Sequence, residues 1–86
     1  MDIVEKVSRA VGMHLLSTAL IVAKALIRNE CITFVEGGRS VVLCGEAALR
    51  EHFRQIYRCA NGDAPDDEVE EAYRLFRELY LKNGAP

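Results

Sequence analysis

Apolar residues recur every three or four positions between residues 2 and 28, which is the period of an amphipathic helix. Asp2 and Glu5, three residues apart, resemble a capping box at its start. Gly12 interrupts the pattern and costs about 1 kcal/mol relative to alanine in a helix interior. The sequence therefore predicts one long N-terminal helix over residues 2–28, kinked at Gly12, or two shorter helices divided there. The apolar stripe consists of Val4, Val7, Val11, Leu15, Ala19, Val22 and Leu26.

The period changes to two in the next segment, where runs rich in Val, Ile, Thr and Phe flank Gly37-Gly38. A Gly-Gly pair supplies the positive φ angles of a tight turn, so the segment is predicted to form a β-hairpin. The turn also sets the register, which places Cys31 opposite Cys44 at the open end. One face of this hairpin has the composition of an ordinary core face, with Ile32, Phe34, Val41 and Leu43.

The second face of the hairpin is small and largely apolar instead of charged. A solvent-facing sheet surface normally carries polar side chains, and a lone two-stranded hairpin with two free edges is marginal in water. We therefore expect this face to be covered, either by helices of the same chain or by a partner. The residues assigned to self-association as a homodimer are Thr33, Val35, Ser40 and Val42.

Two further amphipathic helices are expected after the hairpin, over residues 46–60 and 65–82. The short connection between them, which begins at Asn61-Gly62, makes them an antiparallel pair. The core-facing positions are Leu49, Phe53, Ile56, Tyr57 and Ala60 in the first helix and Val69, Ala72, Leu75, Phe76 and Leu79 in the second. The predicted fold is a single α+β domain over residues 1–86, in the order helix, hairpin, helix, helix.

Composition narrows the classes of function. Half of the 86 residues are hydrophobic and 28% are charged, as in a globular domain. The formal net charge of −2 gives no general attraction to nucleic acid or anionic membranes. The most apolar run, residues 15–27, contains Lys24 and is too short for a membrane span. No secretory signal is visible, so we expect a cytoplasmic protein without membrane contact.

The cysteines and histidines show no spacing typical of metal ligands. In a reducing cytoplasm Cys31, Cys44 and Cys59 act as free, small hydrophobic side chains. The alternative is a cross-strand disulfide between Cys31 and Cys44, which the register allows. His14 and His52 lack a partner at ligand spacing, and the serines and threonines lack a recognisable base. We expect no metal, no cofactor and no catalytic residues, and therefore no enzyme.

Two charged surfaces are candidate partner sites. Arg50, Arg54 and Arg58 recur every four residues and form one ridge of a helix, which suits phosphates or an acidic protein surface. Six acids without an intervening base lie between residues 63 and 71, where a helix dipole also favours them. A third possibility is that ridge and acids neutralise each other across the helix pair. The candidate docking residues among the acids are Asp66, Asp67 and Glu70.

Tyr73 and Tyr80 lie on one side of the last predicted helix, next to its apolar stripe. Tyrosine is a common interface anchor, although a place at the border of the core fits these positions equally. The sequence as a whole favours a small protein-interaction module, an adaptor, regulator or inhibitor that occupies a surface of a larger protein partner and self-associates. The alternative is a nucleic-acid-binding regulator that uses the arginine ridge; the net charge and the order of elements argue against it.

Overall fold

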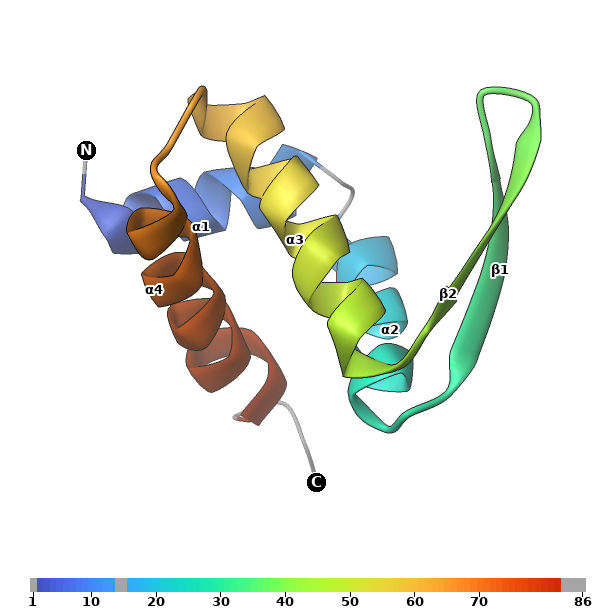
Figure 1. The fold of residues 1–86 in the computed structure, drawn as a ribbon. Coiled ribbons are helices and arrows are strands. Elements are labelled where there is room, and N and C mark those ends of the chain that lie inside the picture. The colour runs from blue at the N-terminus through green and yellow to red at the C-terminus, as the bar shows by residue number, and fades with distance from the viewer. Residues whose placement is uncertain (1, 14–15, 83–86) are drawn as a thin grey trace.

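The computed structural model describes residues 2–13 and 16–82, and within them the chain forms an α+β domain. The helices gather on one side, and the hairpin stands beside them (Figure 1). The elements are, in chain order, α1 (Ile3–Met13), α2 (Leu16–Ile27), β1 (Cys31–Glu36), β2 (Arg39–Cys44), α3 (Gly45–Asn61), α4 (Asp66–Phe76) and the π-helical turn η1 (Arg77–Lys82).

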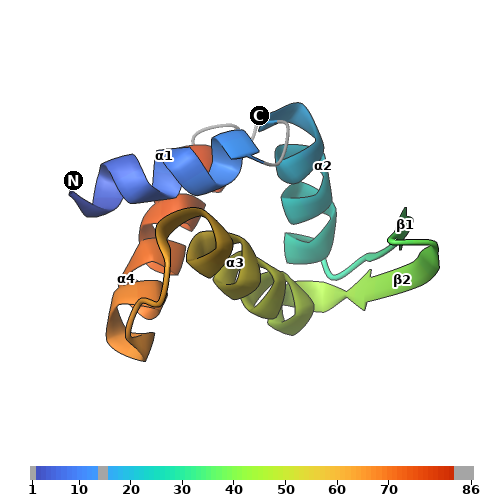
Figure 2. The same cartoon turned by 90° about the horizontal axis from the view of Figure 1, so that it is seen from above.

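The N-terminal segment forms two helices, so the single long helix was wrong and the two-helix alternative is confirmed. The helices run in different directions (Figure 2). One helix over residues 2–28 would be about 40 Å long, whereas the longest axis of the protein is 33 Å. A continuous helix would therefore carry its apolar stripe beyond the core. Gly12 lies exposed inside α1, so the helix is not divided at this glycine, and residues 14–15 lie outside the described residues.

The start of α1 has the predicted cap. The Asp2 carboxylate oxygen Oδ1 accepts a hydrogen bond from the backbone N–H of Glu5 at 2.9 Å. This bond satisfies one of the N–H groups that a helix start leaves without a partner in the helix.

The hairpin has the predicted register. Glu36 pairs with Arg39 next to the turn, and Cys31 pairs with Cys44 at the open end. The turn residues Gly37 and Gly38 have φ angles of 58° and 78°, as a two-residue hairpin turn with two positive φ angles requires.

A disulfide joins Cys31 and Cys44, so the expectation of three free cysteines was wrong. The register brings the two Cα atoms to 4.1 Å, and residues paired across a hairpin are close enough to be bridged. Cys59, near the end of α3, is a free and exposed thiol. The cysteines therefore no longer support the inference of a reducing compartment.

The hairpin enters the helical part of the fold through a tight junction. Gly45 directly follows β2 and has a φ angle of 75°, and a Cβ atom placed there would lie 2.9 Å from Oδ1 of Asn29. The Gly45 N–H donates to the carbonyl of Glu30 at 3.1 Å. α2 and α3 thus converge at the base of the hairpin, with a glycine at the point of closest approach.

The core lies between the helices, around the aromatic rings of α3 and α4. The Phe53 ring lies 5.8 Å from that of Tyr57, 5.7 Å from that of Tyr73 and 4.9 Å from that of Phe76. The other buried apolar residues surround this group: Val7, Ala10, Val11, Ala23, Leu26, Leu49, Ile56, Val69, Ala72 and Leu81.

The π-helical turn changes which leucine reaches the core at the end of the chain. α-Helical spacing predicted Leu79, but this side chain is 43% exposed, whereas Leu81 is 6% exposed. Leu81 follows Phe76 by five residues, which is the hydrogen-bonding interval of a π-helix. The prediction of Leu79 as a core residue was therefore wrong because the helical period widens after Phe76.

Leu81→Ala should lower the free energy of unfolding by about 2–5 kcal/mol, because it removes buried apolar surface and leaves a cavity. Leu79→Ala is the matched control two residues away and should cost less than about 1 kcal/mol. Chemical denaturation followed by circular dichroism measures both values. Equal losses, or a larger loss at Leu79, would show that the α-helical register continues.

Candidate functional site

The arginine ridge of α3 faces the acids of α4, so the third possibility derived from the sequence is observed. Asp66 Oδ1 lies 2.7 Å from Nη2 of Arg54 and 2.8 Å from Nη2 of Arg58. Arg50 Nη1 lies 3.6 Å from Oε2 of Glu70. The hydrogen bond from Arg58 and the positive charge of Arg54 hold the pKa of Asp66 below its usual value. The ridge therefore contacts carboxylates of its own chain.

Arg58 also fixes the connection between α3 and α4. Its Nε and Nη2 atoms donate to the carbonyl oxygen of Ala64 at 3.1 and 2.9 Å. The guanidinium thus binds a backbone carbonyl and a carboxylate together, as its planar fork of donors permits. Asp67 has a local role as well, because its Oδ1 accepts the N–H of Glu68 at 2.9 Å.

The two tyrosines proposed as anchors lie in different environments. Tyr73 is buried, and its hydroxyl donates to Oε2 of Glu46 at 2.9 Å. The guanidinium carbon of Arg50 lies 5.2 Å from the centre of its ring. Tyr73 is therefore a core residue, with 3% of its surface exposed. The spacing of four residues from Val69, also buried, could have indicated this.

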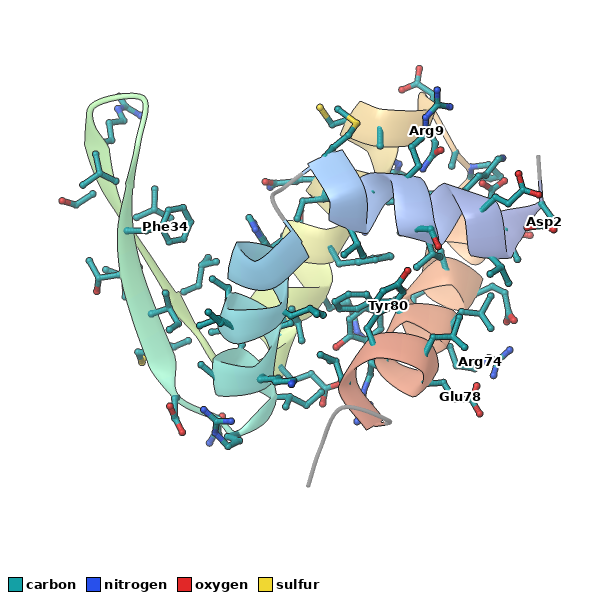
Figure 3. All side chains as sticks on the ribbon, turned by 180° about the vertical axis from the view of Figure 1, so that it is seen from behind. Asp2, Arg9, Phe34, Arg74, Glu78 and Tyr80 are labelled. Carbon is teal, nitrogen blue, oxygen red and sulfur yellow. A yellow bond between two sulfur atoms is a disulfide. The ribbon has the colours of Figure 1, made fainter. Side chains whose placement is uncertain are left out.

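Tyr80 is half-buried where η1 passes α1. Its hydroxyl lies 2.9 Å from Oγ of Ser8, and its ring stacks on Phe76 with 5.8 Å between centres. Figure 3 shows Tyr80 between the helices. It serves to attach the last turn of the chain to the first helix.

A polar cluster that the sequence did not reveal joins α1, α3 and α4. Glu68 Oε2 accepts hydrogen bonds from the Tyr57 hydroxyl at 2.7 Å and from Lys6 Nζ at 3.0 Å. The Asn61 side chain adds a link, because its Nδ2 donates to the carbonyls of Lys6 and Tyr57 at 3.0 and 3.2 Å. No local spacing predicts this cluster, since Lys6 and Glu68 are 62 residues apart.

At neutral pH the cluster keeps the Tyr57 hydroxyl protonated and the Glu68 carboxyl ionised. Burial raises the pKa of the Tyr57 hydroxyl, and the hydrogen bond to the Glu68 carboxylate raises it further. The hydrogen bonds from Tyr57 and Lys6 lower the pKa of Glu68. A protonated phenol thus donates to an ionised carboxylate, an arrangement that holds helices together.

The outer face of the hairpin is exposed in the part of the chain that the structure describes. Val35 and Val42 are 73% and 61% exposed, and Thr33 and Ser40 are exposed beside them. The inner face behaves as predicted, because Ile32 and Leu43 pack partly against the core. In Figure 3 the Phe34 ring points from the hairpin toward the helices.

The inner face of the hairpin also lies next to His52. Its ring lies 6.1 Å from that of Phe34, and the residue is half-buried, not fully exposed. His52 thus helps to seat the hairpin on α3. His14 lies outside the described residues.

Both edges of the hairpin are unpaired within the described residues. β1 and β2 form a two-stranded sheet, so each strand has one neighbour. Natural edge strands are usually protected by charges, proline or bulges. Here charged residues occur only beside the turn, at Glu36 and Arg39. The self-association residues predicted from the sequence thus form one exposed apolar face with two free edges.

An open groove runs along α4 and η1, with Ile27, Tyr73 and Leu81 as its apolar residues. Its charged groups are largely paired with one another. Arg74 contacts Glu71 and Glu78. The remaining charged lining residues are Arg50, Asp67, Glu70 and Arg77, of which Arg77 pairs with Glu46 at 2.9 Å.

Some classes of site have no counterpart in residues 2–13 and 16–82. In these ranges no group of three His, Cys, Asp or Glu side chains could hold a metal ion. No helix there is both long and apolar enough to cross a bilayer. Comparisons with protein-family models, curated proteins and solved structures found no match for this chain.

Stability should fall in acid because the pKa values of Asp66 and Glu68 are lower in the folded than in the unfolded chain. Such groups stabilise the fold above their unfolded pKa, about 4, and this contribution is lost as the pH falls through the folded pKa. Glu68→Gln should therefore reduce the loss of stability between about pH 7 and about pH 3. Tyr57→Phe should also reduce it, since the largest cause of the Glu68 shift is removed. Denaturation curves at both pH values measure the loss of stability. If neither variant differs from wild type in this loss, Glu68 does not have this role.

A double-mutant cycle should show that Arg54 and Asp66 stabilise the fold through each other. Arg54→Ala and Asp66→Ala should each lower the melting temperature, and the double variant should lose less than the sum. Arg50→Ala combined with Asp66→Ala is the control, because Arg50 pairs with Glu70 and the two losses should add. Additive losses in both cycles would mean that the pair contributes nothing.

Proposed function

We propose that this protein is a small protein-interaction module that acts by binding and not by catalysis, and that self-associates through the outer face of its hairpin. The exposed valines Val35 and Val42 carry the proposal, because they lie on a hairpin whose two edges are unpaired. Burial of such a face is favourable by about 25 cal/mol per Å² of apolar surface. A binding partner would supply that burial.

A second copy of this chain fits the face because the face is uncharged. Thr33, Val35, Ser40 and Val42 carry no charge, so two identical surfaces meet without repulsion, as a two-fold symmetric contact requires. An unpaired edge strand also offers backbone N–H and C=O groups to which another strand can add. Valine contact and strand addition are thus both available to a homodimer.

The charged surface of α4 is the place that we propose for a larger protein partner. Asp66, Asp67 and Glu70 are exposed. Asp66 and Glu70 contact arginines of α3, so a basic partner would share or displace those arginines. An adaptor, regulator or inhibitor of this kind would occupy a basic surface of the partner. Arg50, Arg54 and Arg58 contribute indirectly, because they hold α3 against these acids.

The nucleic-acid alternative loses support because its arginines contact carboxylates. Phosphate groups would have to displace Asp66 from both Arg54 and Arg58 before they could bind the ridge.

The cytoplasmic location remains part of the proposal. In that compartment the Cys31–Cys44 pair can be oxidised or reduced, because cytosolic thiols are kept reduced.

Val42→Asp should convert a dimer into a monomer with a mass near 9.6 kDa. The two-fold contact would place a buried carboxylate at each copy of this position, which is costly without a partner charge. Because Val42 is 61% exposed, the isolated chain should stay folded, and circular dichroism checks this. Sedimentation equilibrium measures the mass.

Leu79→Asp is the control for this test, since Leu79 is a partly exposed apolar residue on η1, away from the hairpin. It should leave the mass unchanged. The self-association proposal fails if wild type is a monomer at all concentrations, or if folded Val42→Asp keeps the mass of wild type.

A further inference from the structure

The disulfide lies on the same face as the proposed contact surface. Cys31 precedes Thr33 by two residues and Cys44 follows Val42 by two, and side chains two apart in a strand share a face. Both cysteines are exposed. A thiol in solution can therefore reach the bond from the side on which a second copy would bind.

Few contacts with the helices hold the outer half of the hairpin, where the Phe34 ring lies 6.1 Å from that of His52. At the base, Ile32 and Leu43 pack partly against the core, and the Gly45 N–H donates to Glu30. Beyond them Val35 and Ser40 are exposed, and the strands project away from the helices (Figures 1 and 3). A two-stranded hairpin alone is marginal in water, so its order depends on what ties its ends together.

The disulfide adds a covalent tie at the base of the hairpin, beside the hydrogen bond from Gly45 to Glu30. It joins residues separated by 13 positions in the sequence, and such a link removes much of the closure entropy of the loop. The disulfide lies at the base of the hairpin and opposes separation of the strands at the end far from the glycine turn. Loss of the bond would therefore affect the pairing of β1 and β2 more than the packing of the helices.

We infer that the Cys31–Cys44 disulfide is a reducible clamp whose opening by a dithiol disorders the hairpin and weakens self-association; the second effect rests on the proposed function. One thiolate of the dithiol attacks a sulfur of the pair and releases the other cysteine as a thiolate. The second thiol of the reagent then displaces the first cysteine. Two electrons and two protons pass to the protein, which gains two thiols, and the dithiol becomes a disulfide.

Hydrogen exchange tests the clamp directly. All proteins should carry Cys59→Ser, so that the third thiol cannot form bonds between chains. Reduction with dithiothreitol should speed exchange of the paired amides of β1 and β2 by roughly ten- to hundredfold. Amides in the middle of α3 are the internal control and should exchange at an unchanged rate.

A Cys31→Ser/Cys44→Ser variant gives the open state without reductant. Its hairpin amides should exchange as fast as those of the reduced protein, and dithiothreitol should not change them. Circular dichroism confirms that its helices remain. If this variant does not fold, reduction of the Cys59→Ser protein still decides the question on its own.

Sedimentation of the oxidised and reduced proteins tests the second effect. The apparent dissociation constant of the dimer should rise as the inverse square of the fraction of chains whose hairpin is ordered, because both copies must be ordered to bind. The exchange protection that remains in the reduced protein gives that fraction. Equal exchange in both states would overturn the clamp, whatever the mass. Faster exchange together with a monomer in both states would support the clamp and overturn self-association. Faster exchange with a dissociation constant that does not follow the ordered fraction would overturn the link between them.

Discussion

The packing of α3 against the other helices is the contact on which the rest of the structure depends. Its Phe53 ring meets three other aromatic rings, two of them on α4. The same helix begins directly after β2 and ends at the short connection to α4. In a chain of 86 residues one well-packed helix can therefore position the hairpin at one end and the acidic surface of α4 at the other.

Electrostatic contacts hold this arrangement from outside the core. Asp66 binds two arginines of α3, and Glu68 binds Lys6 of α1 and Tyr57 of α3. Exposed ion pairs contribute little individually, but each of these carboxylates contacts two groups at once. The arginine side chains of α3 are therefore paired with carboxylates of the same protein. For this reason we place function first on the exposed face of the hairpin.

The hairpin differs from the helices in what maintains its order. The helices share the core, whereas the hairpin depends on its strand pairing, its turn, the disulfide at its base and a few partly buried side chains. An element of this kind can change state without unfolding the domain, because its free energy of opening is separate from that of the core. The face on which we propose self-association thus belongs to an element that can change state independently of the core.

The sequence alone determined the features that arise from contacts between near neighbours. The Gly37-Gly38 turn set the hairpin register, and the spacing of apolar residues set the buried faces of α3 and of α4 up to Phe76. Contact between the arginine ridge and the acids was one of three interpretations of these charges, since a short connection joins the two helices. Each of these depends on the period of a single element or on one tight turn.

Tertiary structure decided the rest, because those features depend on residues far apart in the chain. The N-terminal stripe divides between two helices because one helix would be longer than the domain. Leu81 replaces Leu79 in the core because the helical period widens after Phe76. Lys6 and Glu68, 62 residues apart, meet because α1 crosses the helix pair. The disulfide lies between these cases: the register made it possible, and only the folded hairpin showed that it forms.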